Sequence, residues 1–294
     1  MARSIGVLAT HSIWTGLVVD LQLSGVRMYP EPGEATVDLK VLPAEEICER
    51  MCKRIIELAE GGPIDSIGAG FPGIVKCGVV QESPNLRQLK GEDMQTKLVT
   101  ALSAAGIRVP VTLLNDADAL AAGIAATRGG LDQLLRVWYL GDGIGFGRYP
   151  RTDAPWELGH SVVSLDPKER YCGCGGVGHL EGIMGNRAMR LRFLDMEPEE
   201  VFAEARKGDQ RASDFVSRWH RALAAATATI VHAEGPGRFY IAGPNADRVN
   251  LEILGRFLMD MVKMSSLQGS FFEIVPNSHD LALIGAAVAS RPEA

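Results

Sequence analysis

Two cysteines and two histidines, flanked by carboxylates, lie close together between residues 157 and 181. Thiolates and imidazoles are ligands that zinc prefers, and a structural zinc site takes four of them in a tetrahedron. Glycines separate these residues, which allows the backbone to wrap closely around an ion. A glycine-rich loop with incidental cysteines is the alternative, but this density of cysteine and histidine favours a metal. The segment predicts a structural zinc site with the ligands His160, Cys172, Cys174 and His179.

A second candidate group is Asn115-Asp116, which follows the short apolar run at residues 111–114. This run predicts a buried strand, and open α/β sheets bind their ligands at the carboxyl ends of strands. Asp116 is therefore a candidate catalytic carboxylate. The alternative is that Asp116 caps the helix predicted to begin at Ala117, a common role for aspartate.

The zinc segment resembles the signature of the ROK family (repressors, open reading frames and sugar kinases), which reads Glu-x-Gly-His, a spacer, and Cys-x-Cys-Gly-x-x-Gly-Cys-x-Glu. Glu157 and Glu181 stand at its two ends, and His179 replaces its last cysteine. The resemblance covers nearly the whole chain, from about residue 4 to residue 290. Other stretches in the family's order are Phe71-Pro72-Gly73, Pro84-Asn85-Leu86, and residues 114–119 and 140–145.

The resemblance implies an α/β, two-lobed actin-like ATPase (ribonuclease H-like) fold with a central cleft. It implies an N-terminal lobe of residues 1–115 plus 280–294 and a C-terminal lobe of residues 116–279 that carries the zinc loop. Hydrophobic periodicity independently predicts alternating strands and helices, which is typical of α/β folds. We expect strands at 4–8, 15–21, 64–70, 111–114, 135–140, 161–165, 239–242 and 272–275, and helices at 44–60, 94–105, 117–127, 198–207, 211–233, 245–264 and 281–289.

The resemblance also implies a sugar site. In this family the aspartate matching Asp116 is the base that takes a proton from a sugar hydroxyl, and the residue matching Asn115 bonds a neighbouring hydroxyl. His160 would bind zinc through one ring nitrogen and offer the other to the sugar. Trp156 replaces a residue that is usually small in the family, and it would either stack on the sugar or pack between the lobes. The remaining sugar contacts implied are Gly73, Asn85, Glu157 and Glu181.

The nucleotide side departs from the family pattern. Leu8 stands where the family's first strand ends in the aspartate of Asp-x-Gly-Gly-Thr, and Thr10 and His11 replace its glycines. In the second phosphate loop, Asp142 introduces a negative charge and Phe146 replaces a glycine with a bulky ring. Thr10, His11 or Ser12 could instead bind phosphate, so the use of ATP and magnesium stays open. The glycines retained for nucleotide binding are Gly141, Gly143, Gly145 and Gly243.

Composition excludes several classes of protein. The net charge of −6 gives no field that would attract nucleic acid, and no apolar run is long enough to span a membrane. The start of the chain lacks a secretory signal pattern, and five cysteines fit a reducing compartment. We expect a cytoplasmic protein that does not control DNA directly and whose partner is a small sugar or sugar phosphate. Homodimerisation is expected from the family.

Three functions are compatible with these residues. The first is a ROK-type carbohydrate kinase that phosphorylates a hexose-like hydroxyl with Asp116 as base. The second is an enzyme of the same fold that uses its carboxylates for hydrolysis or isomerisation of a sugar or sugar phosphate without ATP. The third is a sugar sensor without catalysis.

Overall fold

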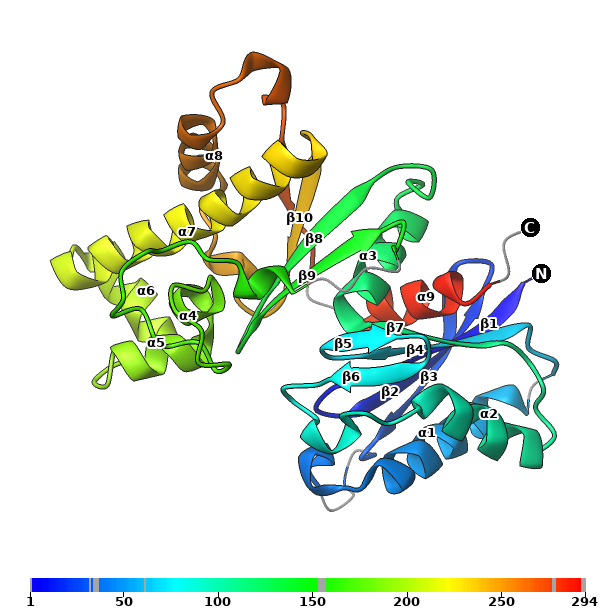
Figure 1. Ribbon diagram of the computed structural model, residues 1–294. Coiled ribbons are helices and arrows are strands. Elements are labelled where there is room, and N and C mark those ends of the chain that lie inside the picture. Colours follow the sequence, from blue (N-terminus) through cyan, green and yellow to red (C-terminus); the bar gives the residue numbers. More distant parts are fainter. Residues whose placement is uncertain are drawn as a thin grey trace. The chain divides into compact units, whose positions relative to one another are not determined.

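The computed structural model of the protein describes residues 2–31, 33, 37–60, 62–152, 157–276 and 279–291. The chain divides into two compact α/β units, called unit 1 and unit 2 below (Figure 1). Unit 1 comprises Met1–Leu135, Gly147–Trp156 and Ser278–Ala294, and unit 2 comprises Arg136–Phe146 and Glu157–Asn277. In the described part of the chain, no helix is both long and apolar enough to cross a membrane.

A mixed β-sheet forms the framework of unit 1. Its strands and the adjoining hairpin are β1 (Arg3–Ala9), β2 (Ile13–Val19), β3 (Gln22–Tyr29), β4 (Ser66–Phe71), β5 (Ile74–Lys76), β6 (Val79–Glu82) and β7 (Val111–Asn115). The sheet has the order β3-β2-β1-β4-β7, in which β1, β2 and β3 are antiparallel and β4 and β7 run parallel to β1. Every residue of β4 is buried, as expected for a parallel strand that is covered on both faces.

Helices cover both faces of this sheet (Figure 1). They are α1 (Ala44–Ala59), α2 (Met94–Ala104), α3 (Asp116–Thr127) and α9 (His279–Ala289). Ile47, Met51 and Ile55 form a fully buried stripe along α1, which confirms the helical spacing predicted there. On the other face, α9 packs against β1, β4 and α3.

The α9 helix approaches its neighbours through glycines. A Cβ atom built on Gly68 would lie 1.8 Å from the carbonyl oxygen of Ala286, and one built on Gly123 would lie 1.7 Å from that of Leu281. Since real side chains cannot come so close, only glycine allows α9 to seat on β4 and α3. These contacts join α3 to unit 1, and unit 1 therefore continues to Leu135, beyond the boundary expected near residue 115.

Unit 2 is built on the strands β8 (Leu135–Leu140), β9 (Ile144–Tyr149), β10 (Arg238–Ala242) and β11 (Phe271–Ile274), in the order β11-β10-β8-β9. Its helices are α4 (Glu181–Met184), α5 (Asn186–Arg192), α6 (Pro198–Lys207), α7 (Gln210–Glu234) and α8 (Leu251–Met261). Trp138 of β8 and Trp219 of α7 are fully buried in its core. The Trp138 ring meets the Phe146 ring edge-on, with the centroids 4.8 Å apart.

Two elements of unit 2 differ from the prediction. The helix expected over residues 245–264 is shorter, because Asn250 caps a new start by accepting a hydrogen bond from the Ile253 N–H, and α8 runs only from Leu251 to Met261. The strand expected over residues 161–165 forms only a single bridge between Val162 and His179. The sequence also did not predict β3, β5, β6, β9, α4 or α5, most of which are short.

A pair of helical glycines provides a test of the α9 contact. Gly123→Ala is expected to lower the free energy of unfolding by about 3 kcal/mol or more, because its methyl group would overlap the Leu281 carbonyl. Gly255→Ala in α8 is the matched control: nothing lies within 4 Å of the added atom. That substitution should raise stability by about 0.5–1 kcal/mol through helix propensity alone. Urea unfolding of both variants measures the difference, and similar values would contradict the proposed packing.

Candidate metal centre and catalytic carboxylate

The predicted zinc ligands converge at one point in unit 2. His160 Nδ1 lies 3.3 Å from Cys172 Sγ, Cys172 Sγ lies 3.4 Å from Cys174 Sγ, and Cys174 Sγ lies 3.2 Å from His179 Nδ1. The two histidine Nδ1 atoms are 3.4 Å apart, and all four donor atoms lie within 4.8 Å of one another. Ligands at tetrahedral zinc distances are separated by about 3.3–3.8 Å. The donor set and its spacing therefore fit a single zinc ion.

Backbone hydrogen bonds hold the loop that presents these ligands. The N–H groups of Val163 and Ser164 donate to the Gly178 carbonyl at 2.8 and 3.2 Å, and the Gly178 N–H donates to the Glu169 carbonyl at 2.7 Å. Gly178 has a φ of +71°, and a Cβ there would lie 1.8 Å from the Ser164 carbonyl oxygen. Glycine is thus required next to His179. Burial lowers the pKa of His179, with His160 adding to the effect, and so favours the neutral imidazole that binds metals.

The two acidic ends of the signature contact the metal ligands from different sides. His160 turns its other nitrogen, Nε2, toward Glu157, whose Oε2 lies 3.8 Å away. Glu181 Oε2 accepts a hydrogen bond from the Ile144 N–H at 3.2 Å, and its Oε1 lies 3.5 Å from Cys172 Sγ. The structure thus brings Glu157, His160 and Glu181 around the metal loop, as expected for residues that a metal keeps in place. Trp156 lies outside the described residues.

In unit 1, Asp116 is the first residue of α3, directly after β7. Asn115 is the helix cap: its Oδ1 accepts hydrogen bonds from the Ala117 N–H at 2.8 Å and the Asp118 N–H at 3.3 Å. The Asn115 amide nitrogen donates to the Gly73 carbonyl at 2.7 Å. Asp116 Oδ1 shares the Ala117 N–H at 3.0 Å, and the cap does not depend on this contact. Asn115, rather than Asp116, is therefore the residue that caps α3.

Burial raises the pKa of Asp116 from its ordinary value of 3.8 to about 6, against hydrogen bonds from backbone N–H groups and the charge of His11, which lower it. The Asp118 carboxyl is buried, and burial raises its pKa to about 6 as well. Asp118 Oδ1 accepts a hydrogen bond from the Arg148 N–H at 2.9 Å. Two carboxyl groups with raised pKa values at one strand end are typical of functional sites.

The sequence did not identify all the residues that surround Asp116 and Asp118. His11 was named only as a residue that could bind phosphate, yet it lies close enough to Asp116 to affect its pKa. Arg148 and Arg151 both act on the charge of Asp118, and Arg151 donates to the Leu113 carbonyl at 2.7 Å. No motif marked the two arginines: Arg148 lies near the end of β9, and Arg151 follows that strand.

Gly73 and Asn85 follow β4 and β6. Gly73 has a φ of +95°, and a Cβ there would lie 2.2 Å from the Glu82 carbonyl oxygen, so glycine is required by the backbone alone. The hydrogen bond from the Asn115 amide to its carbonyl links Gly73 to the residue directly before Asp116. Asn85 is exposed in the segment after β6.

The predicted nucleotide-side glycines lie around the turn between β8 and β9 and after β10. The Gly141 N–H donates to the Gly143 carbonyl at 3.0 Å, and a Cβ on Gly143 would lie 2.6 Å from Glu181 Oε2. Gly145 lies within β9. Gly243 has a φ of +97° and approaches the Leu140 carbonyl. Gly143 and Gly243 therefore have structural reasons to be glycine that do not involve a phosphate.

Three of the departures on the nucleotide side have different structural consequences. The bulky ring of Phe146 is buried in the core, where it packs against Trp138. Leu8 is a buried residue of β1 and offers no metal ligand. Asp142 is exposed in the turn, and Arg190 lies 3.7 Å from its Oδ1. The position of Leu8 thus offers no carboxylate that could bind magnesium.

Comparison with known proteins agrees with this description. The model of the ROK family matches residues 33–289. The glucokinase of Pyrobaculum calidifontis is 31% identical over 249 residues, which cover 79% of this chain and 81% of that protein. The N-acetylmannosamine kinase of Haemophilus influenzae (strain 86-028NP) is 27% identical over 259 residues, which cover 83% of this chain and 84% of that protein.

Among solved structures, a ROK hexokinase from Thermus thermophilus superposes with a TM-score of 0.77 at 22% identity, covering 98% of this chain and 97% of that chain. The predicted fold class, α/β of the actin-like ATPase type, is confirmed by this likeness. The match of the family model, which spans most of the sequence, establishes the relationship that the zinc signature indicated. The chain belongs to the ROK family.

Proposed function

We propose that this protein is a sugar kinase that transfers a phosphoryl group to a hydroxyl of a hexose-like sugar, with Asp116 as the catalytic base. The observation that carries the proposal is the placement of Asp116: it is a partly buried carboxylate directly after β7, its capping role is taken by Asn115, and burial raises its pKa to about 6. The glucokinase and N-acetylmannosamine kinase relatives support the same class of reaction.

A base of this kind suits phosphoryl transfer. At neutral pH a carboxyl with a pKa of about 6 is mostly ionised, yet it is a stronger base than an ordinary aspartate. It orients the sugar hydroxyl and accepts its proton as the oxygen attacks the phosphorus. Asn115 keeps one amide hydrogen beyond its bond to Gly73 for a neighbouring hydroxyl.

The acidic residues of unit 2 are proposed to bind further sugar hydroxyls. Glu181 Oε2 uses one lone pair on the Ile144 N–H and has another to accept from a hydroxyl. His160 would offer Nε2 to the sugar or to Glu157 while Nδ1 binds the metal. Zinc would be held by His160, Cys172, Cys174 and His179, and its contribution would be to fix the ring of His160. We derive no step through magnesium, because Leu8 provides no ligand for it.

Formation of a sugar phosphate tests the proposal. The protein is incubated with ATP–Mg²⁺ or with inorganic polyphosphate, each with glucose and with N-acetylmannosamine, and the products are identified by ³¹P NMR. Both donors are included because Leu8 and Asp142 alter the donor side. A sugar phosphate in any of these mixtures supports the kinase. If every mixture lacks it while sugar binding is measurable by calorimetry, the kinase proposal fails.

The pH dependence of turnover should show the Asp116 titration. We expect kcat/KM to fall about tenfold per pH unit below pH 6, because the base is lost as the pH falls through its pKa. The charge of Asp116 raises the pKa of Asp118, so the two carboxyl groups titrate as a pair and broaden this limb. A pH–rate profile from pH 4.5 to pH 8 measures it. A value of kcat/KM that stays constant down to pH 4.5 would contradict a base whose pKa is raised from its ordinary value of 3.8.

A second candidate is acid–base chemistry on a sugar phosphate without a nucleotide. Leu8 favours it, since the first strand lacks a carboxylate for magnesium. This candidate requires conversion of a sugar phosphate in the presence of EDTA and the absence of any phosphoryl donor, which NMR of the same sugars would detect. If no sugar phosphate is converted under those conditions, this second candidate is excluded.

A further inference from the structure

A cavity of about 570 Å³ lies in unit 2 beside the metal loop. One wall is the face of α7 that carries Ser217, Arg218 and Arg221, and α8 contributes Phe257 and Met261 opposite it. The α7 and α8 helices pack side by side (Figure 1). This volume is in the range of small-molecule sites.

Small residues on α7 leave the space open. Ala222 and Ala225 line the cavity one and two turns along from Arg218, so no long side chain fills the gap between the helices. Val163, Ser164 and Ile183 of α4 complete the lining. The cavity therefore combines an apolar wall with a wall of hydroxyl and guanidinium groups.

The arginines of this cavity differ in their partners. Arg218 donates to the buried Glu169 at 2.7 Å, and Glu169 also pairs with Arg192, so one carboxylate serves two guanidinium groups. Arg221 has no hydrogen-bond or ion-pair partner among the described residues. Asp214, the one acidic residue lining the cavity within the described chain, accepts a hydrogen bond from Gln210 at 2.8 Å. The lining thus has an excess of positive charge and an unused guanidinium group.

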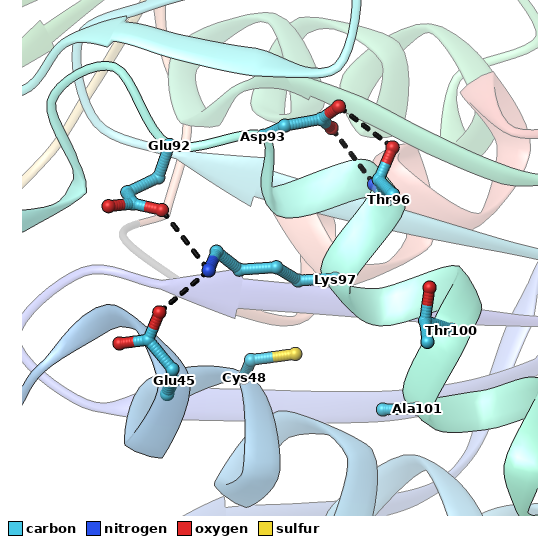
Figure 2. Close-up of a pocket in the computed structure, with 8 residues that line it drawn as sticks. All are labelled: Glu45, Cys48, Glu92, Asp93, Thr96, Lys97, Thr100 and Ala101. Carbon is cyan, nitrogen blue, oxygen red and sulfur yellow. Dashed lines mark hydrogen bonds and ion pairs between the residues drawn. The ribbon is translucent and has the colours of Figure 1, made fainter.

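A hollow of similar size in unit 1 shows the contrast (Figure 2). There Lys97 lies between Glu45 and Glu92, at 2.6 and 3.2 Å, and Asp93 accepts hydrogen bonds from Thr96. The one cation drawn in Figure 2, Lys97, is therefore already paired with two carboxylates. Among the residues that the structure describes, that hollow offers no unpaired cationic group to an anionic ligand, whereas the cavity beside α7 does.

We propose that the cavity between α7 and α8 binds a small organic phosphate. The phosphate would accept hydrogen bonds from Arg221 and Ser217, with the charge of Arg218 nearby. Guanidinium groups match phosphate in geometry and charge, and such hydrogen bonds are among the stronger ones in proteins. The organic part would lie against Phe257 and Met261. The inference does not rest on the sugar-kinase proposal, since the site contains neither Asp116 nor a metal ligand.

Calorimetric titration of the full chain, without sugar or phosphoryl donor, tests whether the cavity binds a small organic phosphate. The probes are phenyl phosphate, inorganic phosphate and phenol, which separate the anion from the apolar body. We expect saturable binding of phenyl phosphate that is tighter than that of inorganic phosphate, with no binding of phenol. Arg221→Ala should weaken phenyl phosphate binding about tenfold or more, and Arg221→Lys should lose less because it keeps the charge.

Two further variants locate the bound molecule. Ala225→Phe should abolish binding by filling the cavity, and Arg206→Ala should leave it unchanged, because Arg206 is an exposed arginine of α6 outside the lining. If Ala225→Phe does not fold, the Arg221 series decides alone. Absence of saturable binding of phenyl phosphate, or binding equally strong in Arg221→Ala, overturns the proposal. Either result leaves the kinase assay unaffected, since that assay depends on Asp116.

Discussion

Replacing Asp116 with asparagine is expected to abolish phosphoryl transfer while making the folded protein more stable at neutral pH. The amide cannot accept the hydroxyl proton, and loss of a general base reduces kcat by a factor of about 10² to 10⁴. Sugar binding should largely survive, because asparagine keeps the size of the side chain and can still accept a hydrogen bond from the Ala117 N–H. Steady-state kinetics and calorimetric sugar titration separate the two effects.

The gain in stability follows from the raised pKa. The folded protein binds a proton at Asp116 more tightly than the unfolded chain does, so the ionised carboxylate at neutral pH costs folding energy. A rise from 3.8 to about 6 corresponds to at most about 3 kcal/mol at pH 7. This cost is absent below pH 4, grows as the pH rises to 6, and is removed in Asp116→Asn.

Asp93 provides the matched control within unit 1. It also begins a helix, but hydrogen bonds from Thr96 lower the pKa of this exposed carboxyl, so its ionised form favours folding. Asp93→Asn should therefore leave turnover unchanged and should not stabilise the protein at neutral pH. If Asp116→Asn turns over like the wild type, Asp116 is not the base. If it is less stable at pH 7, its carboxylate has a structural role instead.

The second large effect is expected from Cys172→Ser. The wild-type protein should contain about one zinc ion per chain, and this variant should contain none, because a hydroxyl is a poor zinc ligand. Loss of a structural zinc ion costs several kcal/mol of folding free energy, and the melting temperature should fall accordingly. Elemental analysis and thermal unfolding, each with and without a chelator, give both quantities.

Two cysteine variants control this experiment. Cys48→Ser removes another buried thiol, from α1 in unit 1, and should retain zinc. His179→Cys restores the last cysteine of the family signature and should retain zinc as well. A wild-type protein without zinc, whose unfolding is indifferent to the chelator, would rule out the metal centre.

The metal centre could be predicted from the sequence because its ligands are local. His160 and His179 are separated by a single loop, and the loop's own hydrogen bonds bring the donor atoms together. The roles at Asn115 and Asp116 could not be assigned in this way. Both residues are suitable helix caps, and only the position of the first helical turn shows that Asn115 is the one that caps α3.

The burial of Phe146 in the core had a signal in the sequence. Ile144 and Phe146 alternate with Gly145 along β9, and the two large side chains point into the core as period-two alternation requires. The family resemblance to a glycine loop obscured that pattern. The cavity beside α7 had no such signal, because α8, which forms its apolar wall, is remote in sequence from Arg221.

The seating of α9 has a consequence for biosynthesis. Gly6 and Gly68 of the first sheet contact backbone that is synthesised more than two hundred residues later. A nascent chain on the ribosome therefore cannot complete unit 1 until residues 279–289 have emerged, whereas the segments of unit 2 are all present earlier. We expect the segments of unit 2 to acquire protease resistance first, while the amino-terminal sheet stays incomplete until α9 has emerged.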